Sequence, residues 1–306
     1  MSAQDTSIHD AHIGDATTPT PETVNNVQER RRRLLIDGCR QFGHIVNKSR
    51  PDRFELYYDD EMGYIYCLVS KASCTSWKGT LMMLTGNITK YQSAEQLPRG
   101  MVHDFRNSDK YVKRLGELPQ AHRDRRFNSY FTFLFVREPL ERLVSAYHDK
   151  LFEDPGYHVD VDIVRQYRPH DYNASIKRYN VTFAEFVRYV LDQRDAGRAL
   201  DRHWIPQSEL CRVCKYRYDF IGHQETLQQD ASFVVSKLKS RISNEQQRQR
   251  VANVTFPADS GHRKSRDLVE RMYAGVPAAH VQALYELYAS DYAIFGFKHP
   301  NVTQFA

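Results

Sequence analysis

The segment that most constrains the fold has the layout of a phosphate-binding turn without its glycines. The apolar run YIYCLV (64–69) predicts a buried strand, and Trp77, Leu81 and Leu84 follow at helical spacing. The turn between them, SKASCTS (70–76), carries hydroxyls, a thiol and Lys71. Because a helix N-terminus attracts anions, this turn is either a phosphate-binding loop or a capped helix start with surface lysines. The glycines of the Walker pattern are absent.

A second turn has related chemistry. The aromatic run SYFTFLFV (129–136) predicts a buried strand, and Pro139 suits the first turn of the helix after it. Arg137 stands at the strand end and Ser145 lies on the helix. An arginine binds an oxyanion through two parallel hydrogen bonds, so the pair is suited to hold one phosphate. The alternative is an Arg137 ion pair and an ordinary helical serine.

The remaining pattern predicts an α/β fold. We expect further strands at FELYY (54–58) and YRYDFIG (216–222), and helices over 29–42, 75–84, 182–191, 227–239 and 277–295. Thr182 and Glu185 form a capping-box pattern. Alternating strands and helices favour a mainly parallel sheet flanked by helices. Ligands of such sheets bind at the carboxyl ends of the strands, where both turns lie.

Charge divides the 306-residue chain into two parts. Residues 1–29 carry five acidic residues and no lysine or arginine, which predicts a flexible acidic tail. Residues 30–306 are expected to form a single domain with a net charge of about +10. A basic body favours anionic partners, although surface lysines and arginines alone explain it as well. We interpret RRRR (30–33) as the polar start of a helix.

Glycosylation signals and cysteines bear on the compartment. Six N-x-S/T sequons begin at Asn47, Asn87, Asn173, Asn180, Asn253 and Asn301, where chance predicts about one or two. This excess indicates a secretory lumen, whereas no signal peptide or membrane anchor is evident. The pair Cys211 and Cys214 could form half of a zinc site with His203 and His223, a redox pair, or disulfides.

Four motifs together resemble one enzyme family. They are SKASCTSWK (70–78), REPLERLVSA (137–146), LCRVCKYRYDFIGHQET (210–226) and DYAIFGF (291–297). They are similar, in this order, to motifs of the Golgi carbohydrate sulfotransferases. The nearest group contains the chondroitin and dermatan 4-O-sulfotransferases and the sulfotransferase of terminal glucuronic acid. This chain departs from the group's pattern at Ser70, Ser76, Gly79 and Val213.

The resemblance implies a P-loop-like sulfotransferase fold and the donor 3′-phosphoadenosine 5′-phosphosulfate, without a metal. The 5′-phosphosulfate loop would comprise Lys71, Ala72, Ser73, Cys74, Thr75, Ser76, Trp77 and Lys78. Arg137 and Ser145 would bind the 3′-phosphate, and Lys71 would neutralise the leaving group. His103, in MVHDF (101–105), is the candidate general base, because an imidazole has a suitable pKa. The resemblance also favours disulfides, with Cys74 left unpaired.

The implied activity is sulfuryl transfer to a glycan hydroxyl, with the 4-OH of N-acetylgalactosamine in chondroitin or dermatan as the expected acceptor. The partner is then an anionic glycan rather than nucleic acid. The expected location is the Golgi lumen, through a membrane anchor absent from this chain, or the secreted fraction. Two alternatives stay open: a nucleotide kinase or NTPase with a degenerate phosphate loop, and a glycan-binding protein without activity.

Overall fold

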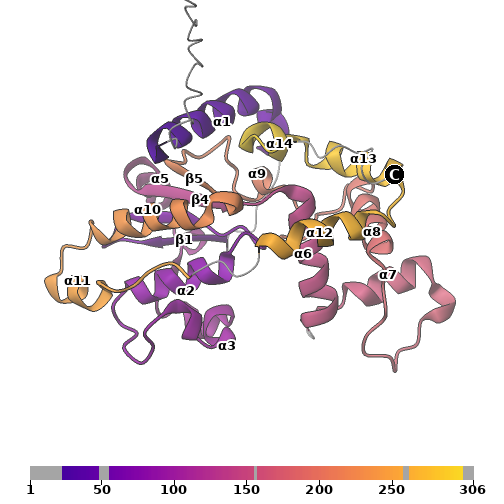
Figure 1. Cartoon of the computed structure of the whole chain (residues 1–306), viewed down its shortest axis with the longest axis horizontal. Coiled ribbons are helices and arrows are strands. Elements are labelled where there is room, and N and C mark those ends of the chain that lie inside the picture. The colour runs from indigo at the N-terminus through magenta and orange to yellow at the C-terminus, as the bar shows by residue number, and fades with distance from the viewer. Residues whose placement is uncertain (1–22, 48–54, 155–156, 258–261, 299–306) are drawn as a thin grey trace, which may run out of the picture.

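A five-stranded mixed sheet forms the centre of the molecule (Figure 1). The computed structural model describes residues 23–47, 55–154, 157–257 and 262–298, without the side chains of Phe105 and residues 262–267. The strands are β1 (Leu56–Asp59), β2 (Tyr64–Cys67), β3 (Lys113–Arg114), β4 (Phe131–Val136) and β5 (Phe220–His223), in the order β3-β1-β2-β4-β5.

The sheet is parallel only where the two anion-binding turns were predicted. β4 runs parallel to β2 and β5, whereas β1 runs antiparallel to β2 and β3. The expectation of a mainly parallel sheet is therefore wrong at β1. A tight turn that contains Gly63, at φ 58°, joins β1 to β2, and a connection this short permits only antiparallel pairing.

Helices cover both faces of the sheet. They are α1 (Val24–Val46), α2 (Cys74–Leu84), α3 (Arg99–His103), α4 (Phe105–Ser108), α5 (Gln120–Ser129), α6 (Pro139–His148), α7 (Val159–Tyr167), α8 (Phe183–Asp195), α9 (Gln207–Leu210), α10 (Leu227–Lys239), α11 (Glu245–Val251), α12 (His262–Tyr273), α13 (Ala278–Leu287) and α14 (Ala289–Phe295). The predicted helices are confirmed in type and approximate position, except that the single helix expected over 277–295 is two helices, α13 and α14, separated at Tyr288.

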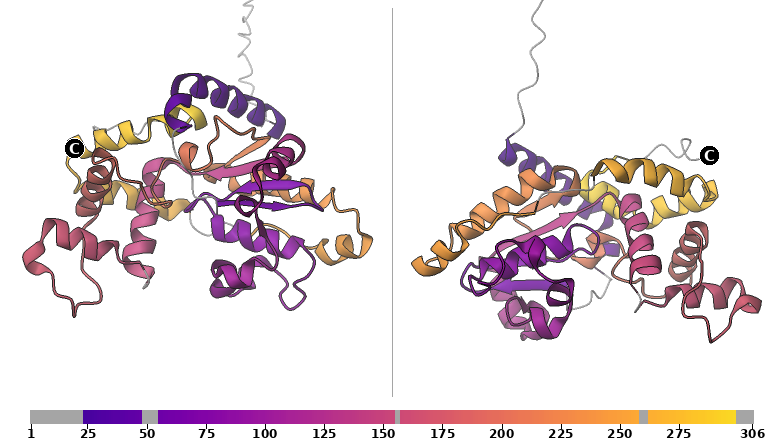
Figure 2. Two further views of the ribbon diagram at one scale, coloured as in Figure 1. Left: turned by 180° about the vertical axis from the view of Figure 1, so that it is seen from behind. Right: turned by 60° about the horizontal axis from the view of Figure 1, so that its bottom comes forward.

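Alternation along β4 gives each face of the sheet its own core. Phe133 and Phe135 pack with Trp77 of α2. Leu134 and Val136 belong to the opposite core, which includes residues of α1 and α14. A third core joins α6, α7, α8, α12 and α13 into a helical lobe beside the sheet, shown from two further sides in Figure 2.

Two predicted boundaries are corrected. α1 begins at Val24, so residues 24–29 belong to a helix rather than to the acidic tail. The reason is a tertiary contact that composition does not reveal: the Gln28 amide donates to the Ile221 carbonyl and accepts from its N–H, both at 3.0 Å. β5 begins at Phe220 instead of residue 216. The predicted capping box of α8 is confirmed, since Thr182 and Glu185 bond reciprocally.

Two disulfides fix the C-x₂-C segment to α1 and to the end of β2. Cys39 of α1 bonds Cys214, and Cys67 at the end of β2 bonds Cys211. Cys74 is the unpaired cysteine, as predicted. The zinc and redox interpretations of the C-x₂-C pair are therefore wrong. Disulfides persist in oxidising compartments, which agrees with the excess of sequons.

Gly38 allows α1 and α14 to pack closely. A Cβ atom at this position would lie 2.6 Å from Ile294 Cγ1 and 2.9 Å from Ile294 Cα. Because the second contact is with backbone, the helices would have to separate. We expect Gly38→Ala to lower the free energy of unfolding by roughly 1–3 kcal/mol, measured by urea denaturation. Gly275→Ala, where no atom lies within 4 Å of the new Cβ, is the control; equal midpoints for both variants would contradict the prediction.

Candidate active site

The loop between β2 and α2 turns without glycine. Lys71 and Ser73 both have left-handed backbones, at φ 71° and 57°. Such a conformation costs about 1–2 kcal/mol per residue outside glycine, so the surrounding structure must enforce it. Turns of this kind direct successive N–H groups toward one point and favour a bound anion. The first N–H groups of α2 add the positive end of the helix dipole.

Arg142 of α6 holds this loop in place. Its side chain is 1% exposed, and its guanidinium donates to the carbonyls of Ser70, Ile205 and Arg202 at 2.9, 2.8 and 2.8 Å. One buried arginine therefore ties the start of the loop to the segment 202–205. Ser73 adds a second anchor, because its hydroxyl donates to Gln224 Oε1 at 2.8 Å.

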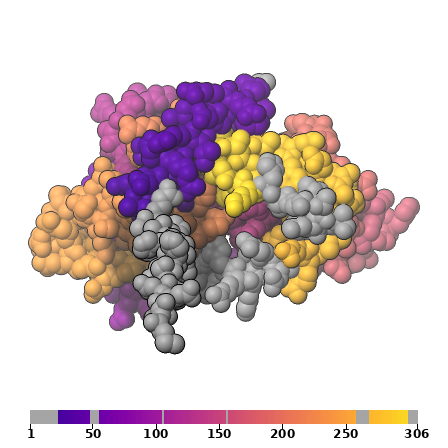
Figure 3. Space-filling model, turned by 45° about the horizontal axis from the view of Figure 1, so that its top comes forward, coloured from indigo at the N-terminus to yellow at the C-terminus, as the bar shows by residue number. Residues whose placement is uncertain are grey.

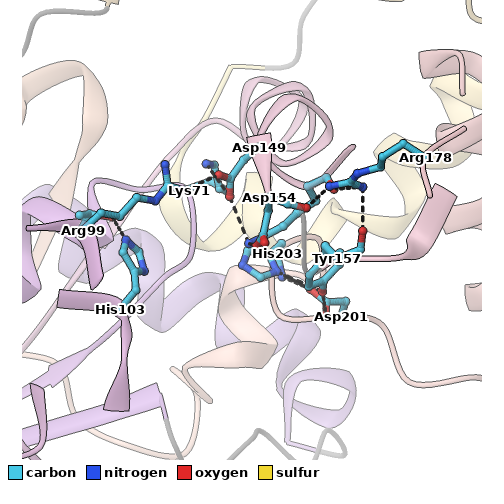
Figure 4. A network of polar contacts seen from close by, with 11 residues as sticks. Lys71, Arg99, His103, Asp149, Asp154, Tyr157, Arg178, Asp201 and His203 are labelled. Carbon is cyan, nitrogen blue, oxygen red and sulfur yellow. Dashed lines mark hydrogen bonds and ion pairs between the residues drawn. The ribbon is translucent and has the colours of Figure 1, made fainter. Parts of the chain in front are cut away.

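A cleft of about 480 Å³ opens in front of the loop. The charged and imidazole side chains that line it are Lys71, Lys78, Arg99, Lys150, Arg202, Glu55, Asp149, Glu153, Asp154, His103 and His203. Figure 4 shows many of these side chains directed toward one another from the loop, α3 and the segments after α6 and before α9. The cleft thus combines cations for an anionic ligand with two candidate bases.

Asp149 connects the cations of the cleft. It lies in a π-helical turn, Asp149–Glu153, that extends α6, and such turns are frequent at functional sites. Its carboxylate lies 3.3 Å from both Lys71 Nζ and Lys150 Nζ and 3.0 Å from Arg99 Nη2. Burial alone would raise the pKa of Asp149, but the two lysines outweigh it and lower that pKa to about 2. Asp149 therefore stays ionised and orients Lys71.

His103 stands over the first turn of α2. Its Nε2 lies 3.0 Å from Thr75 Oγ1, so the imidazole and the loop hydroxyl meet as the sequence predicts for a shared site. Partial burial and the positive charges of Arg99, Lys78 and Lys150 lower the pKa of His103 below 6.5. The ring is consequently neutral at pH 7 and able to accept a proton.

His203 is a second imidazole in the cleft, with a different environment. Its Nδ1 lies 2.6 Å from Asp201 Oδ1, and Tyr157 donates a hydrogen bond to the other oxygen of that carboxylate. Burial lowers the pKa of His203 to about 4, despite the opposing effect of Asp201. A pKa of about 4 makes His203 a weak base at neutral pH, although a carboxylate orients it.

Arg137 and Ser145 lie outside the residues that line this cleft. Arg137, Glu141 and Ser145 follow one another at intervals of four residues, so they lie on one side of α6 and of the residues just before it. All three are partly exposed. Arg137 forms an ion pair with Glu141 at 3.4 Å. Gln207 fixes the strand end, since it accepts from Arg137 N at 2.9 Å and donates to Arg137 O at 2.8 Å. The two predicted residues thus share one face beside the loop.

The predicted loop residues divide into two groups. Lys71, Cys74, Thr75 and Lys78 line the cleft. Burial lowers the pKa of the Lys78 ammonium to about 8. The side chains of Ala72 and Trp77 are fully buried.

Trp77 packs in the aromatic core under the loop. It therefore supports the loop from below. Ser76 is partly exposed but does not line the cleft.

Four residues that line the cleft were not predicted from the sequence: Arg99, Asp149, Lys150 and Arg202. Their positions depend on tertiary structure, because they come from three separate segments. The only local signal is an Asp–Lys pair in the last turn of the helix expected after Pro139, and such pairs also occur on ordinary surfaces. The burial of Asp149 and Lys150, each 8% exposed, is what marks them, and burial appears only in the structure.

The cleft combines a strained loop at the end of a parallel strand with several cations and a neutral imidazole. This combination is typical of enzymes that transfer a group from an anionic donor. Comparison with known proteins specifies the class. Residues 54–298 match the model of the sulfotransferase family, and the chain belongs to this family. It is a sulfotransferase, and the kinase interpretation is therefore wrong.

The similar curated proteins are carbohydrate sulfotransferases. Mouse carbohydrate sulfotransferase 12 is 30% identical over 97% of this chain and 73% of its own length. Zebrafish carbohydrate sulfotransferase 14 is 32% identical over 90% and 73%. Human carbohydrate sulfotransferase 9 is 32% identical over 90% of this chain, which spans 61% of that relative. No solved structure matches significantly.

In the part of the chain that the structure describes, no helix is both long and apolar enough to cross a membrane. Within the same residues, histidine, cysteine, aspartate and glutamate form no cluster suited to a metal ion.

Proposed function

We propose that the chain transfers the sulfuryl group of 3′-phosphoadenosine 5′-phosphosulfate to a glycan hydroxyl, most specifically the 4-OH of N-acetylgalactosamine in chondroitin or dermatan. The observation that carries the proposal is the meeting of Lys71, Thr75 and His103 in one cleft. The loop from residue 70 to residue 76 acts as a P-loop-like phosphosulfate loop in which left-handed residues replace glycines.

The residues present fit the donor. The strained loop and the start of α2 offer N–H groups to the 5′-phosphosulfate, with Lys71 beside them. Arg137 and Ser145, on one face at the end of the neighbouring strand β4, serve the 3′-phosphate. Glu141 orients Arg137 through their ion pair.

The transfer needs an in-line arrangement of acceptor and leaving group. The acceptor oxygen forms a bond to sulfur while the bond from sulfur to the 5′-phosphate oxygen breaks. The acceptor proton passes to His103, and the electron pair stays on the phosphate oxygen of adenosine 3′,5′-bisphosphate. Lys71 neutralises the charge that develops there, and its link to Asp149 fixes the ammonium in position.

Arg137→Ala is expected to weaken donor binding by roughly 2–4 kcal/mol, as for a desolvated charge-assisted contact. Isothermal titration with adenosine 3′,5′-bisphosphate measures the loss. Adenosine 5′-phosphate, which lacks the 3′-phosphate, is the control ligand and should bind both proteins alike. Unchanged affinity for the bisphosphate would remove Arg137 from the 3′-phosphate site.

The acceptor and the compartment complete the proposal. A basic body suits an anionic glycan, and the sequons and disulfides fit the Golgi lumen, or secretion, for the working enzyme. The test uses donor labelled with ³⁵S and desulfated chondroitin, dermatan and heparan acceptors, followed by mapping of the labelled hydroxyl. Label at another position would correct the acceptor, and absence of transfer to any glycan would contradict the function.

A further inference from the structure

A second, larger hollow lies at the opposite end of the strands. It has a volume of about 710 Å³ and reaches Phe131 and Phe220, the first residues of β4 and β5. The cleft with His103 lies instead beyond the carboxyl end of β2. α1 and α10 both contribute residues to this hollow and contact each other, and Figure 3 shows α1 beside the orange segment that contains α10. We call it the basic groove.

Charge is the first notable property of the basic groove. Among the described residues that line it, Arg32, Arg217, Lys237 and Arg241 are cationic and Asp219 is the only carboxylate. That carboxylate is already engaged, because it accepts from Thr132 N at 3.0 Å and from Arg217 at 2.6 Å. The cleft that contains His103, which we call the donor cleft, is lined by five lysine and arginine side chains and by four carboxylates among the described residues. The groove is therefore the more positive of the two hollows.

The cations are held over an aromatic floor. The Lys237 ammonium and the Arg241 guanidinium lie 5.2 and 6.0 Å from the centre of the Phe131 ring. Phe220 and Phe233 stack beside it, with ring centres 5.3 Å apart. Ile36 of α1 also lines the groove, with 48% of its surface exposed. Cations, apolar surface and the amides of Asn25 and Asn128 make a mixed surface.

Two neighbouring arginines of the run 30–33, Arg31 and Arg32, have different environments in the structure. Arg31 is buried, with an ion pair to Asp230 at 2.8 Å and a hydrogen bond to the Ile221 carbonyl at 2.8 Å. Arg32 points to the groove, and its contact with Glu29, at 3.6 Å, is exposed. Arg31 therefore holds α1 on the sheet, and Arg32 is available to a ligand.

We propose that the basic groove binds a distal part of an anionic glycan chain whose reacting sugar lies in the donor cleft. This inference rests on the proposed function, because it assigns the groove the same class of ligand as the acceptor. Carboxylate or sulfate groups of the chain meet the cations, sugar hydroxyls meet the amides, and the apolar faces of the sugar rings pack on the aromatic and aliphatic floor. The groove then selects for long acceptors.

The test compares a chondroitin polymer with a chondroitin tetrasaccharide as acceptors of the full chain. Arg32→Gln combined with Lys237→Gln removes two groove cations whose side chains donate no hydrogen bond to the backbone of the described residues. Arg188→Gln combined with Arg198→Gln removes the same charge from the exposed side of the helical lobe. We expect the groove variant to raise KM for the polymer about three- to tenfold, with KM for the tetrasaccharide and kcat unchanged.

A binding measurement separates this inference from the proposed function. Fluorescence anisotropy of labelled chondroitin without donor should show the same weakening in the groove variant, with less dependence on salt than in wild type. Equal polymer affinity in wild type, groove variant and control would overturn the inference. Transfer to the tetrasaccharide by the same proteins would show that the proposed function still holds.

Discussion

Replacing His103 with alanine is expected to lower kcat for sulfuryl transfer by about 10²–10⁴-fold, the usual contribution of a general base. The imidazole stands 3.0 Å from Thr75 on the donor loop, whereas the residues assigned to the 3′-phosphate lie on another element. Donor affinity should therefore change little. Single-turnover kinetics with saturating donor measures the loss.

The pH profile identifies which imidazole acts. Only the neutral ring accepts a proton, so the wild-type rate should fall as pH decreases through the pKa of the base. For His103 this limb lies on the acidic side of 6.5, and for His203 it would lie near 4. His103→Ala should lose the limb, and His122→Ala, an exposed histidine of α5, should keep it. A folded His103→Ala variant with normal turnover would transfer the role to His203.

Lys71→Ala is expected to lower kcat by about 10²–10³-fold, with a much smaller effect on donor affinity. The charge that Lys71 neutralises develops mainly in the transition state. The variant should fold, because Asp149 retains Lys150 and Arg99 as partners. Lys110→Ala, an exposed lysine outside the cleft, is the control. Normal kcat with a raised KM for donor would limit Lys71 to ground-state binding.

Much of this architecture could be predicted from the sequence, because the signals were local. The strand–loop–helix at 64–84 and the strand before Arg137 depend on hydrophobic periodicity and on one proline. The sheet direction at β1 was missed, since strand pairing depends on the connection as well as on the strands. The start of α1 was missed because the buried contact of Gln28 with β5 joins residues 193 positions apart.

The loop residues of the candidate site could be predicted from the sequence, whereas the other residues that line the cleft could not. Lys71, Thr75 and Lys78 belong to one motif, and His103 followed from a resemblance. Asp149 and Arg202 reach the cleft through the packing of the helical lobe and through Arg142, which no periodicity encodes. The role of Trp77 also needed the structure, because a motif residue under a loop looks the same in sequence as one that faces the ligand.

The three carbonyl contacts of Arg142 bear on how the enzyme can be redesigned. Arg202 and His203 line the same cleft as the loop after β2, and the backbones of the two segments share one guanidinium. Under the proposed function, a backbone shift in the segment 202–205 therefore strains the loop that would bind the donor. Substitutions that change glycan choice should come from side chains that leave this backbone in place, and swapping whole segments between relatives should cost donor binding as well.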